Sequence, residues 1–393
     1  MTGSDGVVIV GGGIIGAAIA FGLARRGVTG VLVAEQGLPP GHGATARSGG
    51  VLRQHHTAAC DIELAVRGTR YYHDWATLVG GSSGYRRTGF VMLVAEEYTD
   101  HLKQNVARVN EAGGASSVLT ARELAELHPG VRVPAGVAVG YEPDGGYADP
   151  AAATRALLAA ARRHGADIAE GVRVTGIETA GDRVAGVRTN LGTIRARQVI
   201  VCAGAWSARL AAGVGVELPL QARRIGIARA AVDAPPGSLP AGIDDTLGTY
   251  FRPVPDGSLY FGVPLDPAVD PDREPAALLA AEVDPVRGRL ATRLPGLATS
   301  PVVGGRVGFD GYTPDKRPVI GPVIGPGNGP AGPDGLYLCT GFSGGGVKVA
   351  PAVGELVAAE LTTGAASPLL TPYRPQRFAA GEPIESDYPY AHS

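Results

Sequence analysis

The chain has 393 residues, and its 35 basic and 37 acidic residues give a net charge of −2 at pH 7. This length predicts about two domains of roughly 150 residues each, and a balanced charge without any basic block excludes the electrostatic footprint of a protein that binds nucleic acid or a membrane surface. Three scattered cysteines predict neither a metal site nor a disulfide framework, and no uncharged apolar run reaches the roughly 18 residues of a membrane span, so we expect a cytoplasmic protein.

The first 36 residues have the pattern of a dinucleotide-binding β-α-β unit. An apolar run at 7–10 predicts a buried parallel strand, and Gly11, Gly13 and Gly16 follow it as G-x-G-x-x-G. The three glycines allow, in turn, a tight turn, the approach of a pyrophosphate to the backbone, and close packing of helix on strand. A second strand at 31–34 leads into Glu35, whose carboxylate can accept hydrogen bonds from ribose hydroxyls and disfavours a 2′-phosphate. The pattern predicts a dinucleotide site and leaves the dinucleotide open.

The next segments alternate between loops and helices. Residues 41–57 are glycine-rich and polar, which predicts an irregular loop, whereas apolar spacing predicts a helix over 58–80. The tetrapeptide TARE at 120–123 is a capping box ahead of a short helix, which the Pro-Gly pair at 129–130 ends. An Asp-Pro pair predicts the start of a further helix over 149–163.

From residue 172 the apolar period changes to two, which is typical of strands. The spacing predicts an antiparallel meander that rejoins the parallel sheet at 199–203. Residues 222–263 predict further antiparallel strands, with a hairpin turn at 255–257. A helix is expected over 274–294.

The last part of the chain returns to strand and helix. A proline- and glycine-rich connection at 321–335 precedes a strand at 336–341 and a helix at 344–364. The final twenty residues are polar and proline-rich, and we expect them to be frayed.

The order of these pieces resembles the D-amino-acid oxidase and sarcosine oxidase type of FAD-dependent oxidoreductase, which includes glycine oxidase-like enzymes, from residue 7 to about 362. Besides the N-terminal fingerprint, the stretches that carry the resemblance are GATARSGGVLRQ (43–54), DGGYADP (144–150), VIVCAGAWSARLA (199–211), GYTPDKRPVIGPV (311–323) and GFSGGGVKVAPAVGE (341–355).

The resemblance implies an α/β fold with a Rossmann-type FAD-binding domain and a second, α+β substrate domain built on a large antiparallel sheet. The implied FAD-binding domain is discontinuous, over 1–85, 144–220 and 300–378. The substrate domain takes 86–143 and 221–299, and 379–393 is left as a frayed tail.

The resemblance also implies an extended, noncovalent FAD with its adenine end at the first β-α-β unit. The helix that starts near residue 344 would point its positive end toward the flavin pyrimidine ring, where reduced flavin carries negative charge. The implied cofactor-binding residues are Gly11, Gly13, Ile14, Ile15, Gly16, Glu35, Gln36, Thr45, Ala46, Arg47, Ser48, Gly49, Val174, Ala203, Gly204, Trp206, Gly341, Gly344, Gly345, Gly346, Val347 and Lys348. For Arg47 the alternative is a surface arginine that pairs with a nearby carboxylate.

Members of this family oxidise a carbon–nitrogen bond by moving hydride to flavin N5, and water hydrolyses the imine. Such chemistry needs a neutral amine and a cation that holds the substrate carboxylate. Arg53 resembles the arginine by which sarcosine oxidases hold that carboxylate, and Lys348 matches a lysine of the monomeric members. A lysine in the first turn of a helix opposes the helix dipole, which favours a functional role. The implied substrate is a small amino acid or secondary amine, sarcosine- or proline-like, and the implied electron acceptor is O2 or another molecule.

Further candidates come from segments expected to face the substrate. His55 directly follows the Arg53 segment, and Tyr250, Tyr260 and Tyr312 come from the antiparallel strands and the GYTPD stretch. Each of them, like His56 and Arg252 beside them, has the alternative of being a packed core residue, and His55 and Tyr250 are the first candidates.

Three departures from the family pattern bear on the reaction. The stretch at 304–311 lacks the cysteine that tethers flavin in monomeric sarcosine oxidases. Tyr260 stands where those oxidases have an oxygen-activating lysine, which raises the alternative of a dehydrogenase. The FDGYTPD stretch is two residues shorter than usual, which leaves the orientation of Tyr312 open.

Other function classes stay open as alternatives. An FAD hydroxylase or an NAD-dependent dehydrogenase is disfavoured because the G-D-A-x-H stretch is missing and because a GFSGGG helix serves no purpose in an NAD enzyme. A non-catalytic FAD-bearing or electron-transfer subunit of a larger amine dehydrogenase is a second alternative, and a specialised biosynthetic amine is a third. The amine, its chirality and the oligomeric state are not fixed by the sequence.

Overall fold

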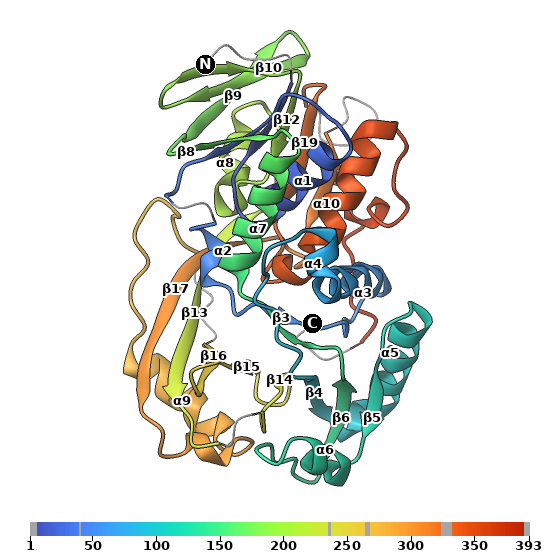
Figure 1. Cartoon of the computed structure of the whole chain (residues 1–393), viewed down its shortest axis with the longest axis vertical. Coiled ribbons are helices and arrows are strands. Elements are labelled where there is room, and N and C mark those ends of the chain that lie inside the picture. The colour runs from blue at the N-terminus through green and yellow to red at the C-terminus, as the bar shows by residue number, and fades with distance from the viewer. Residues whose placement is uncertain (1–5, 39–40, 235–236, 264–267, 324–331, 389–393) are drawn as a thin grey trace.

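The computed structural model describes residues 6–38, 41–234, 237–263, 268–323 and 332–388. Figure 1 shows two large sheets, one at each end of the molecule, with helices packed around them. The upper sheet has six strands in the order β18-β19-β12-β1-β2-β8. Their bounds are β18 (Val319–Pro322), β19 (Leu336–Thr340), β12 (Gln198–Val201), β1 (Val7–Val10), β2 (Val31–Glu35) and β8 (Asp167–Glu170).

This six-stranded sheet is the predicted parallel sheet. Every neighbouring pair is parallel apart from β18 and β19, which run antiparallel. The predicted strands near 7–10, 31–34, 199–203 and 336–341 are therefore confirmed, and residues far apart in the sequence lie side by side in it. The fold is α/β with a Rossmann-type arrangement.

Different elements cover the two faces of this sheet. The helices α1 (Ile14–Arg25), α7 (Pro150–Arg163) and α10 (Gly346–Thr363) bury one face together with Ile9 and Ile200. A three-stranded antiparallel sheet and α8 (Ser207–Ala212) bury the other face with Val8 and Val10. The three strands are β9 (Val174–Ala180), β10 (Arg183–Thr189) and β11 (Gly192–Arg195), which confirms the predicted meander.

The lower sheet has eight strands in the order β17-β13-β16-β15-β14-β4-β6-β5. Its pairs are antiparallel except for the parallel pair of β14 and β4. The bounds are β17 (Val302–Tyr312), β13 (Gln221–Ala231), β16 (Ser258–Val263), β15 (Thr249–Pro253), β14 (Ala241–Asp244), β4 (Phe90–Ala95), β6 (Val137–Glu142) and β5 (Ser117–Leu119). This is the expected large sheet. The expected domain boundaries remain a prediction. They assign residues 300–378 to the FAD-binding domain, whereas β17 belongs to the eight-stranded sheet.

Helices also cover the eight-stranded sheet. The short α6 (Ala121–Leu127) and α9 (Ala280–Leu290) pack on one face, and α5 (Thr99–Glu111) packs on the other. The Thr120 capping box is confirmed, because Thr120 Oγ1 accepts from Glu123 N at 3.2 Å and Glu123 Oε2 accepts from Thr120 N at 2.7 Å. Asp149 caps α7 as predicted, through bonds from the N–H groups of Ala151 and Ala152.

Several expected elements differ in extent. The expected loop over 41–57 contains α2 (Ala44–Arg47) and the strand β3 (Val51–Leu52), which pairs with β7 (Gly146–Tyr147). The expected helix over 58–80 is two helices, α3 (Ala59–His73) and α4 (Trp75–Leu78). The helix expected over 274–294 is limited to α9, and before it the carbonyl oxygens of Ala276 and Ala277 accept hydrogen bonds from the Arg224 side chain. Part of the expected connection at 321–335 lies outside the described residues, and its first residues belong to β18.

The end of the chain is packed through Tyr388, so a frayed tail from residue 379 is wrong for this part. Ile384 N donates to Asp315 Oδ2 at 3.1 Å, and the Thr57 and Ser386 hydroxyls lie 2.9 Å apart. Tyr388 is buried against the eight-stranded sheet. Specific polar partners hold this segment, and residues 389–393 lie outside the described part. No helix in the described ranges is both long and apolar enough to cross a membrane.

Candidate active site

A cavity of about 710 Å³ lies where the two large sheets meet. Val10 and Cys339 from the six-stranded sheet line it on one side, and Ile225, Tyr250 and Gly262 from the eight-stranded sheet line it on the other. Most of the segments that carry the family resemblance contribute lining residues, whereas DGGYADP (144–150) does not line the cavity and contributes β7, the partner of β3.

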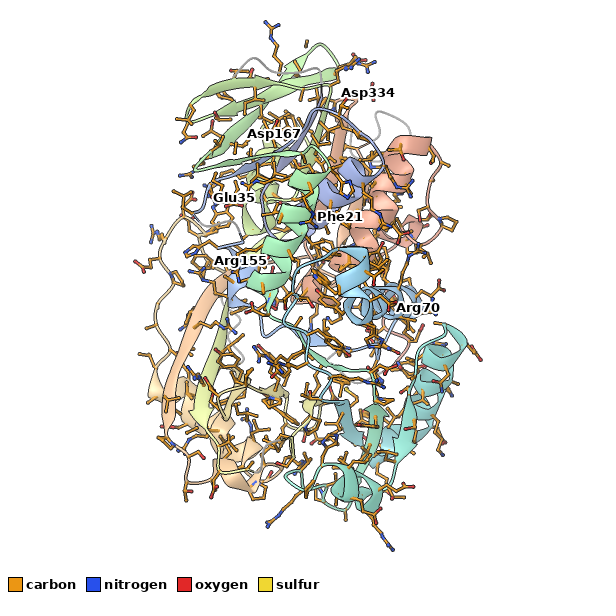
Figure 2. All side chains as sticks on the ribbon, in the orientation of Figure 1. Phe21, Glu35, Arg70, Arg155, Asp167 and Asp334 are labelled. Atoms are coloured by element: carbon orange, nitrogen blue, oxygen red, sulfur yellow. The ribbon has the colours of Figure 1, made fainter. Side chains whose placement is uncertain are left out.

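Glu35 (labelled in Figure 2) lines the end of the cavity that the first β-α-β unit forms. Its carboxylate accepts hydrogen bonds from the N–H groups of Gly12 and Gly37, each at 2.6 Å. Thr45 Oγ1 accepts from Ile14 N at 3.1 Å. Side chains thus position the turn between β1 and α1, and Gln36 also lines the cavity here.

The three fingerprint glycines have distinct roles. Gly11 has a φ of +107°, and a Cβ there would lie 2.5 Å from the carbonyl oxygen of Cys202. A Cβ on Gly16 would collide with the carbonyl oxygen of Gly11, so Gly16 serves helix–strand packing and does not line the cavity. Gly13 lines the cavity, where the absence of a side chain leaves space beside the start of α1.

The segment with α2 forms another wall. Thr45, Arg47, Ser48 and Gly49 line the cavity, whereas Ala46 does not. The Arg47 guanidinium donates to the carbonyl oxygens of His42 and Val307, the latter at 3.2 Å. The partners of Arg47 are therefore backbone carbonyls rather than the carboxylate considered as its alternative.

A short segment after β16 reaches the rim of the cavity. Asp272 accepts a hydrogen bond from Trp206 Nε1 at 2.8 Å and forms ion pairs with Arg209 and, at 3.3 Å, with Arg173. Asp270 adds a second contact to Arg209 at 3.4 Å. Arg173, Trp206 and Arg209 line the cavity. The hydrogen bond from Trp206, followed by that from Arg209, lowers the pKa of Asp272.

The loop before α10 is held by a buried carboxylate. Asp310 accepts hydrogen bonds from Gly344 N at 2.7 Å and Gly311 N at 2.8 Å. Burial raises its pKa to about 6, against the effect of these two N–H donors. This fixes the backbone from which α10 starts, and the expected residues Gly341, Gly344, Gly345, Gly346 and Val347 all line the cavity.

Arg53 and Lys348 both line this cavity, and their role as a carboxylate anchor stays a prediction. Arg53 follows β3 and donates to the carbonyl oxygen of His55, and Lys348 lies in the first turn of α10. Both side chains are buried, with 5% and 6% of their surface exposed. Burial, with the nearby Arg53 charge, lowers the pKa of Lys348 to about 7, whereas Asp61 opposes this shift.

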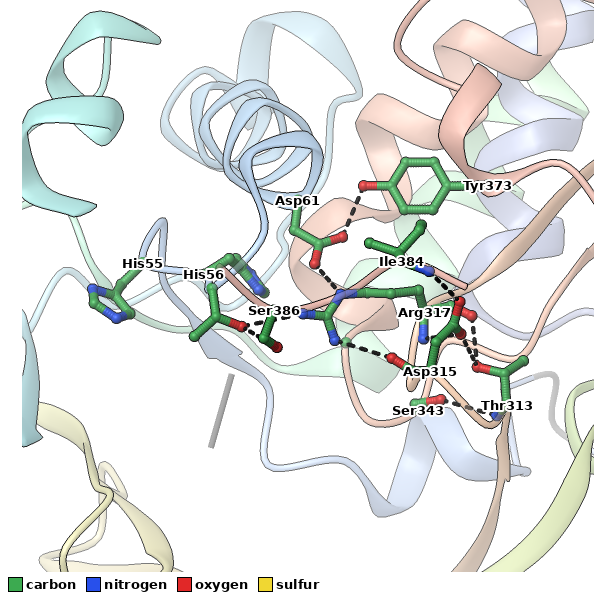
Figure 3. Close-up of polar contacts among 12 residues, drawn as sticks. His55, His56, Asp61, Thr313, Asp315, Arg317, Ser343, Tyr373, Ile384 and Ser386 are labelled. Atoms are coloured by element: carbon green, nitrogen blue, oxygen red, sulfur yellow. Dashed lines mark hydrogen bonds and ion pairs between the residues drawn. The ribbon is translucent and has the colours of Figure 1, made fainter. Parts of the chain in front are cut away.

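An ion pair between Asp61 and Arg317 borders these cations (Figure 3). Asp61 Oδ1 accepts a hydrogen bond from the Tyr373 hydroxyl at 2.8 Å, and Arg317 also donates to Thr57 Oγ1 at 3.2 Å. Desolvation raises the pKa of Asp61, and Arg317 counteracts it. Asp61 and Arg317 line the cavity, as Arg53 and Lys348 do.

His55 and His56 have different environments. His55 N donates to Glu142 Oε1 at 2.5 Å, and the His55 ring points away from the Asp61–Arg317 pair in Figure 3. Among the described residues His56 lines the cavity and His55 does not. Burial, reinforced by Arg53, lowers the pKa of His55 to about 3. Placing His55 against the substrate is therefore not supported, because neighbouring residues of this extended segment face opposite sides.

Of the three candidate tyrosines, two line the cavity and one does not. Tyr250 and Tyr312 line the cavity. Burial raises the pKa of Tyr250 to about 12, so its hydroxyl stays protonated. Tyr260 is not among the lining residues, since its ring lies between the guanidinium groups of Arg252 and Arg306, each 4.6 Å from the ring centroid. Val174, Ala203, Gly204 and Trp206 line the cavity as expected.

Sequence reasoning missed several side chains of the site. Asp61 and Arg317 were not singled out, although Arg317 lies in the GYTPDKRPVIGPV stretch. Asp310 precedes the same stretch. Glu142, whose second oxygen accepts from Gln54 N at 2.7 Å, supports the Arg53 segment from β6. The PDKRP charge pattern is a signal that could have identified Arg317, whereas its pairing with Asp61 has no local signal.

Comparison with known proteins agrees with this geometry. Residues 6–360 match a protein family described as FAD dependent oxidoreductase. The chain is 28% identical over 380 residues to 4-methylaminobutanoate oxidase (formaldehyde-forming) of Paenarthrobacter nicotinovorans, which covers 91% of this chain and 43% of that protein. It is 31% identical over 215 residues to the mitochondrial pyruvate dehydrogenase phosphatase regulatory subunit of Mus musculus, covering 54% of this chain and 24% of that protein. The chain thus spans less than half the length of these two relatives.

A solved structure matches over the whole length. The crystal structure of L-proline dehydrogenase from P. horikoshii superposes with a TM-score of 0.87 at 27% sequence identity. The match covers 97% of this chain and 100% of that one.

Proposed function

The chain belongs to the DAO family of FAD-dependent oxidoreductases, and from this premise we propose that it oxidises the C–N bond of a small amino acid or secondary amine of the proline or N-methylglycine kind. The observation that carries the proposal is the placement of Arg53 and Lys348, two buried cations, in the cavity that the dinucleotide fingerprint also lines. Arginine and lysine are the side chains that bind carboxylates, which supports a substrate carboxylate at this position.

The cavity residues fit FAD. Glu35 lies at the ribose position of the fingerprint, and Gly11 and Gly13 leave the backbone open beside the start of α1. At the other end, α10 starts at Gly346 after two further glycines, and Asp310 holds the backbone before it, so its N–H groups can face the flavin ring. The absence of a cysteine at 304–311 supports noncovalent binding. FAD supplies the hydride acceptor when it is bound.

The side chains of this chain bind and orient the substrate. Arg53 and Lys348 hold the carboxylate and direct the carbon that carries the amine. Because Arg53 and Lys348 are buried, bulk water is excluded from them. Tyr250, whose hydroxyl stays protonated, lines the cavity from the eight-stranded sheet. The substrate amine gives up its proton before the bond to hydrogen breaks, and water hydrolyses the resulting imine afterwards.

An anaerobic titration of the yellow protein tests the proposal. L-proline, D-proline, N-methylglycine, glycine and 4-methylaminobutanoate are added in turn while flavin absorbance is followed, with pyrrolidine as the amine that lacks a carboxylate. We expect bleaching by an α-amino acid and none by pyrrolidine. Equal bleaching by pyrrolidine contradicts the carboxylate anchor.

Admitting air to the same reduced sample tests whether O2 is the electron acceptor. Tyr260 and its two arginine neighbours lie apart from the cavity lining, which supports a dehydrogenase with slow reoxidation. Fast reoxidation in air identifies an oxidase.

The second candidate is a non-catalytic FAD-bearing subunit. The similarity to a regulatory subunit over 54% of the chain favours it, since that relative is not described as an oxidase. A protein that holds FAD but is bleached neither by the amino acids nor by pyrrolidine fits this candidate and contradicts the proposed oxidation.

A further inference from the structure

The segment after β16 connects the two halves of the cavity at its rim. Ala268 bridges to Arg223 of β13, and Val269 N donates to Ala222 O at 3.0 Å, so the segment starts at the eight-stranded sheet. Figure 1 shows residues 268–279, which lead into α9, running along the side of the molecule beside β17. The segment ends in the contacts of Asp270 and Asp272, and we call residues 268–273 the rim strap.

The partners of the rim strap come from the opposite half of the molecule. Arg173 precedes β9, Trp206 ends the short helix before α8, and Arg209 lies in α8. β9 and α8 pack on the six-stranded sheet, and the short helix that Trp206 ends also contacts β13 and β17, whereas the strap extends from the eight-stranded sheet. One carboxylate, Asp272, receives a hydrogen bond or ion pair from all three.

The same three side chains line the cavity at its dinucleotide end. Val174, the neighbour of Arg173, and Ala203 and Gly204, just before Trp206, line it too. Closing this rim restricts the route between the cavity and solvent at the end where the adenosine part of FAD is expected. The strap therefore affects the binding of FAD, and it lies apart from the region around Lys348 where we propose that the substrate binds.

We propose that Asp272 is a positioning residue for FAD, which fixes Arg173, Trp206 and Arg209 at the rim of the cavity and so slows the release of the bound cofactor. A single exposed ion pair contributes little to stability. Here one carboxylate is shared by three donor side chains, so the contacts form a network in which each contact restricts the movement of the others. FAD can leave only after this network opens. The assignment rests on FAD as the cofactor and not on the identity of the amine.

The release of FAD from the holoenzyme tests the assignment without any substrate. The protein is diluted, and free FAD is followed by its fluorescence. We expect Asp272→Asn to release FAD about threefold to tenfold faster than the wild type, since such a network is worth on the order of one tenfold step. Asp272→Glu keeps the carboxylate, and we expect its rate to stay within about twofold of the wild type.

Two controls separate positioning from general destabilisation. Asp284→Asn removes another exposed carboxylate, which pairs with Arg287 at 3.4 Å in α9, and we expect an unchanged release rate. The Tm of flavin-free Asp272→Asn is expected to match that of the flavin-free wild type. Raising NaCl from about 0.05 to 0.5 M is expected to speed release from the wild type more than from Asp272→Asn, because salt screens the ion pairs.

Three results overturn the assignment. One is a wild-type release rate in Asp272→Asn, and another is an equal acceleration in Asp284→Asn. The third is flavin that stays with the wild-type chain after denaturation, because such flavin is bound covalently and its retention does not depend on the strap. Each of these leaves the proposed amine oxidation untouched, and bleaching by amino acids tests that separately.

Discussion

Asp61 and Arg317 form a buried ion pair in the wall of the cavity, although 256 residues separate them along the chain. Asp61 lines the cavity together with the cations Arg53, Arg317 and Lys348. The charge of Asp61 therefore offsets part of the positive charge that Arg53, Arg317 and Lys348 present to the cavity.

Replacing this carboxylate is expected to disturb both stability and charge. Asp61→Asn leaves Arg317 buried without its counter-charge, and we expect a loss of about 3–5 kcal/mol in the free energy of unfolding, measured in urea. Tyr373→Phe removes only the hydrogen bond to Asp61, and about 1 kcal/mol is expected for it. An equal loss in both variants would contradict an electrostatic origin.

Lys348 is expected to make the binding of carboxylates pH-dependent. Its pKa is lowered to about 7, so the cation that attracts an anion is present below pH 7 and is lost as the pH rises through it. Binding of an amine-free carboxylate such as cyclopentanecarboxylate, followed by flavin absorbance, should weaken above about pH 7. Lys348→Met should bind more weakly and without this pH dependence. A wild-type profile that stays flat between pH 6 and 9 would refute the assignment.

The charge of Asp61 is expected to shift that profile. Asp61 raises the pKa of Lys348, so Asp61→Asn lowers this pKa further. The pH at which carboxylate binding weakens should therefore move below its wild-type value. A move to higher pH would have the wrong sign for a neighbouring negative charge.

Glu142 is expected to act on the anchor through the backbone. Its two carboxylate oxygens accept from Gln54 N and His55 N, next to Arg53. In Glu142→Gln one of these buried N–H groups faces an amide NH2, which should cost about 1–3 kcal/mol of unfolding free energy. KM for the amine should rise, while the absorbance spectrum of the bound flavin stays that of the wild type. Glu170→Gln, an exposed partner of Arg162, is the control and should change neither.

The fingerprint turn is expected to tolerate no side chain at Gly16. A Cβ there collides with the carbonyl oxygen of Gly11, so Gly16→Ala should be purified with little or no flavin and should have a lower Tm. Gly288→Ala in α9 meets no atom within 4 Å and should keep full flavin content. Normal flavin in Gly16→Ala would show that this turn does not carry the cofactor.

Local pattern and contiguous motifs made much of the fold predictable. The first β-α-β unit needs only neighbouring residues, and β1, α1 and β2 lie where the apolar period and the glycines predict them. Arg53 and Lys348 were found because each lies in a recognisable stretch. Both contribute to the cavity as expected.

The remaining features depend on contacts between distant segments. No local pattern pairs Asp61 with Arg317 or inserts Tyr260 between two arginines. The choice between His55 and His56 depends on which side of an extended segment faces the cavity. The strands β4 and β6 and the helix α5 between them were not predicted. β4 is buried on both faces, so its sequence lacks the apolar–polar alternation that marks a strand.

The strand order of the six-stranded sheet also has a consequence for biosynthesis. β1 finds its partner β2 almost at once, but its other neighbour, β12, is synthesised nearly 190 residues later, and β19 later still. Until then the nascent chain carries an apolar strand with one open edge, which is an aggregation hazard. Such distant pairings also slow folding. Because residues from both sides of β12 line the cavity, the ribosome must release most of the polypeptide before FAD has a complete place to bind.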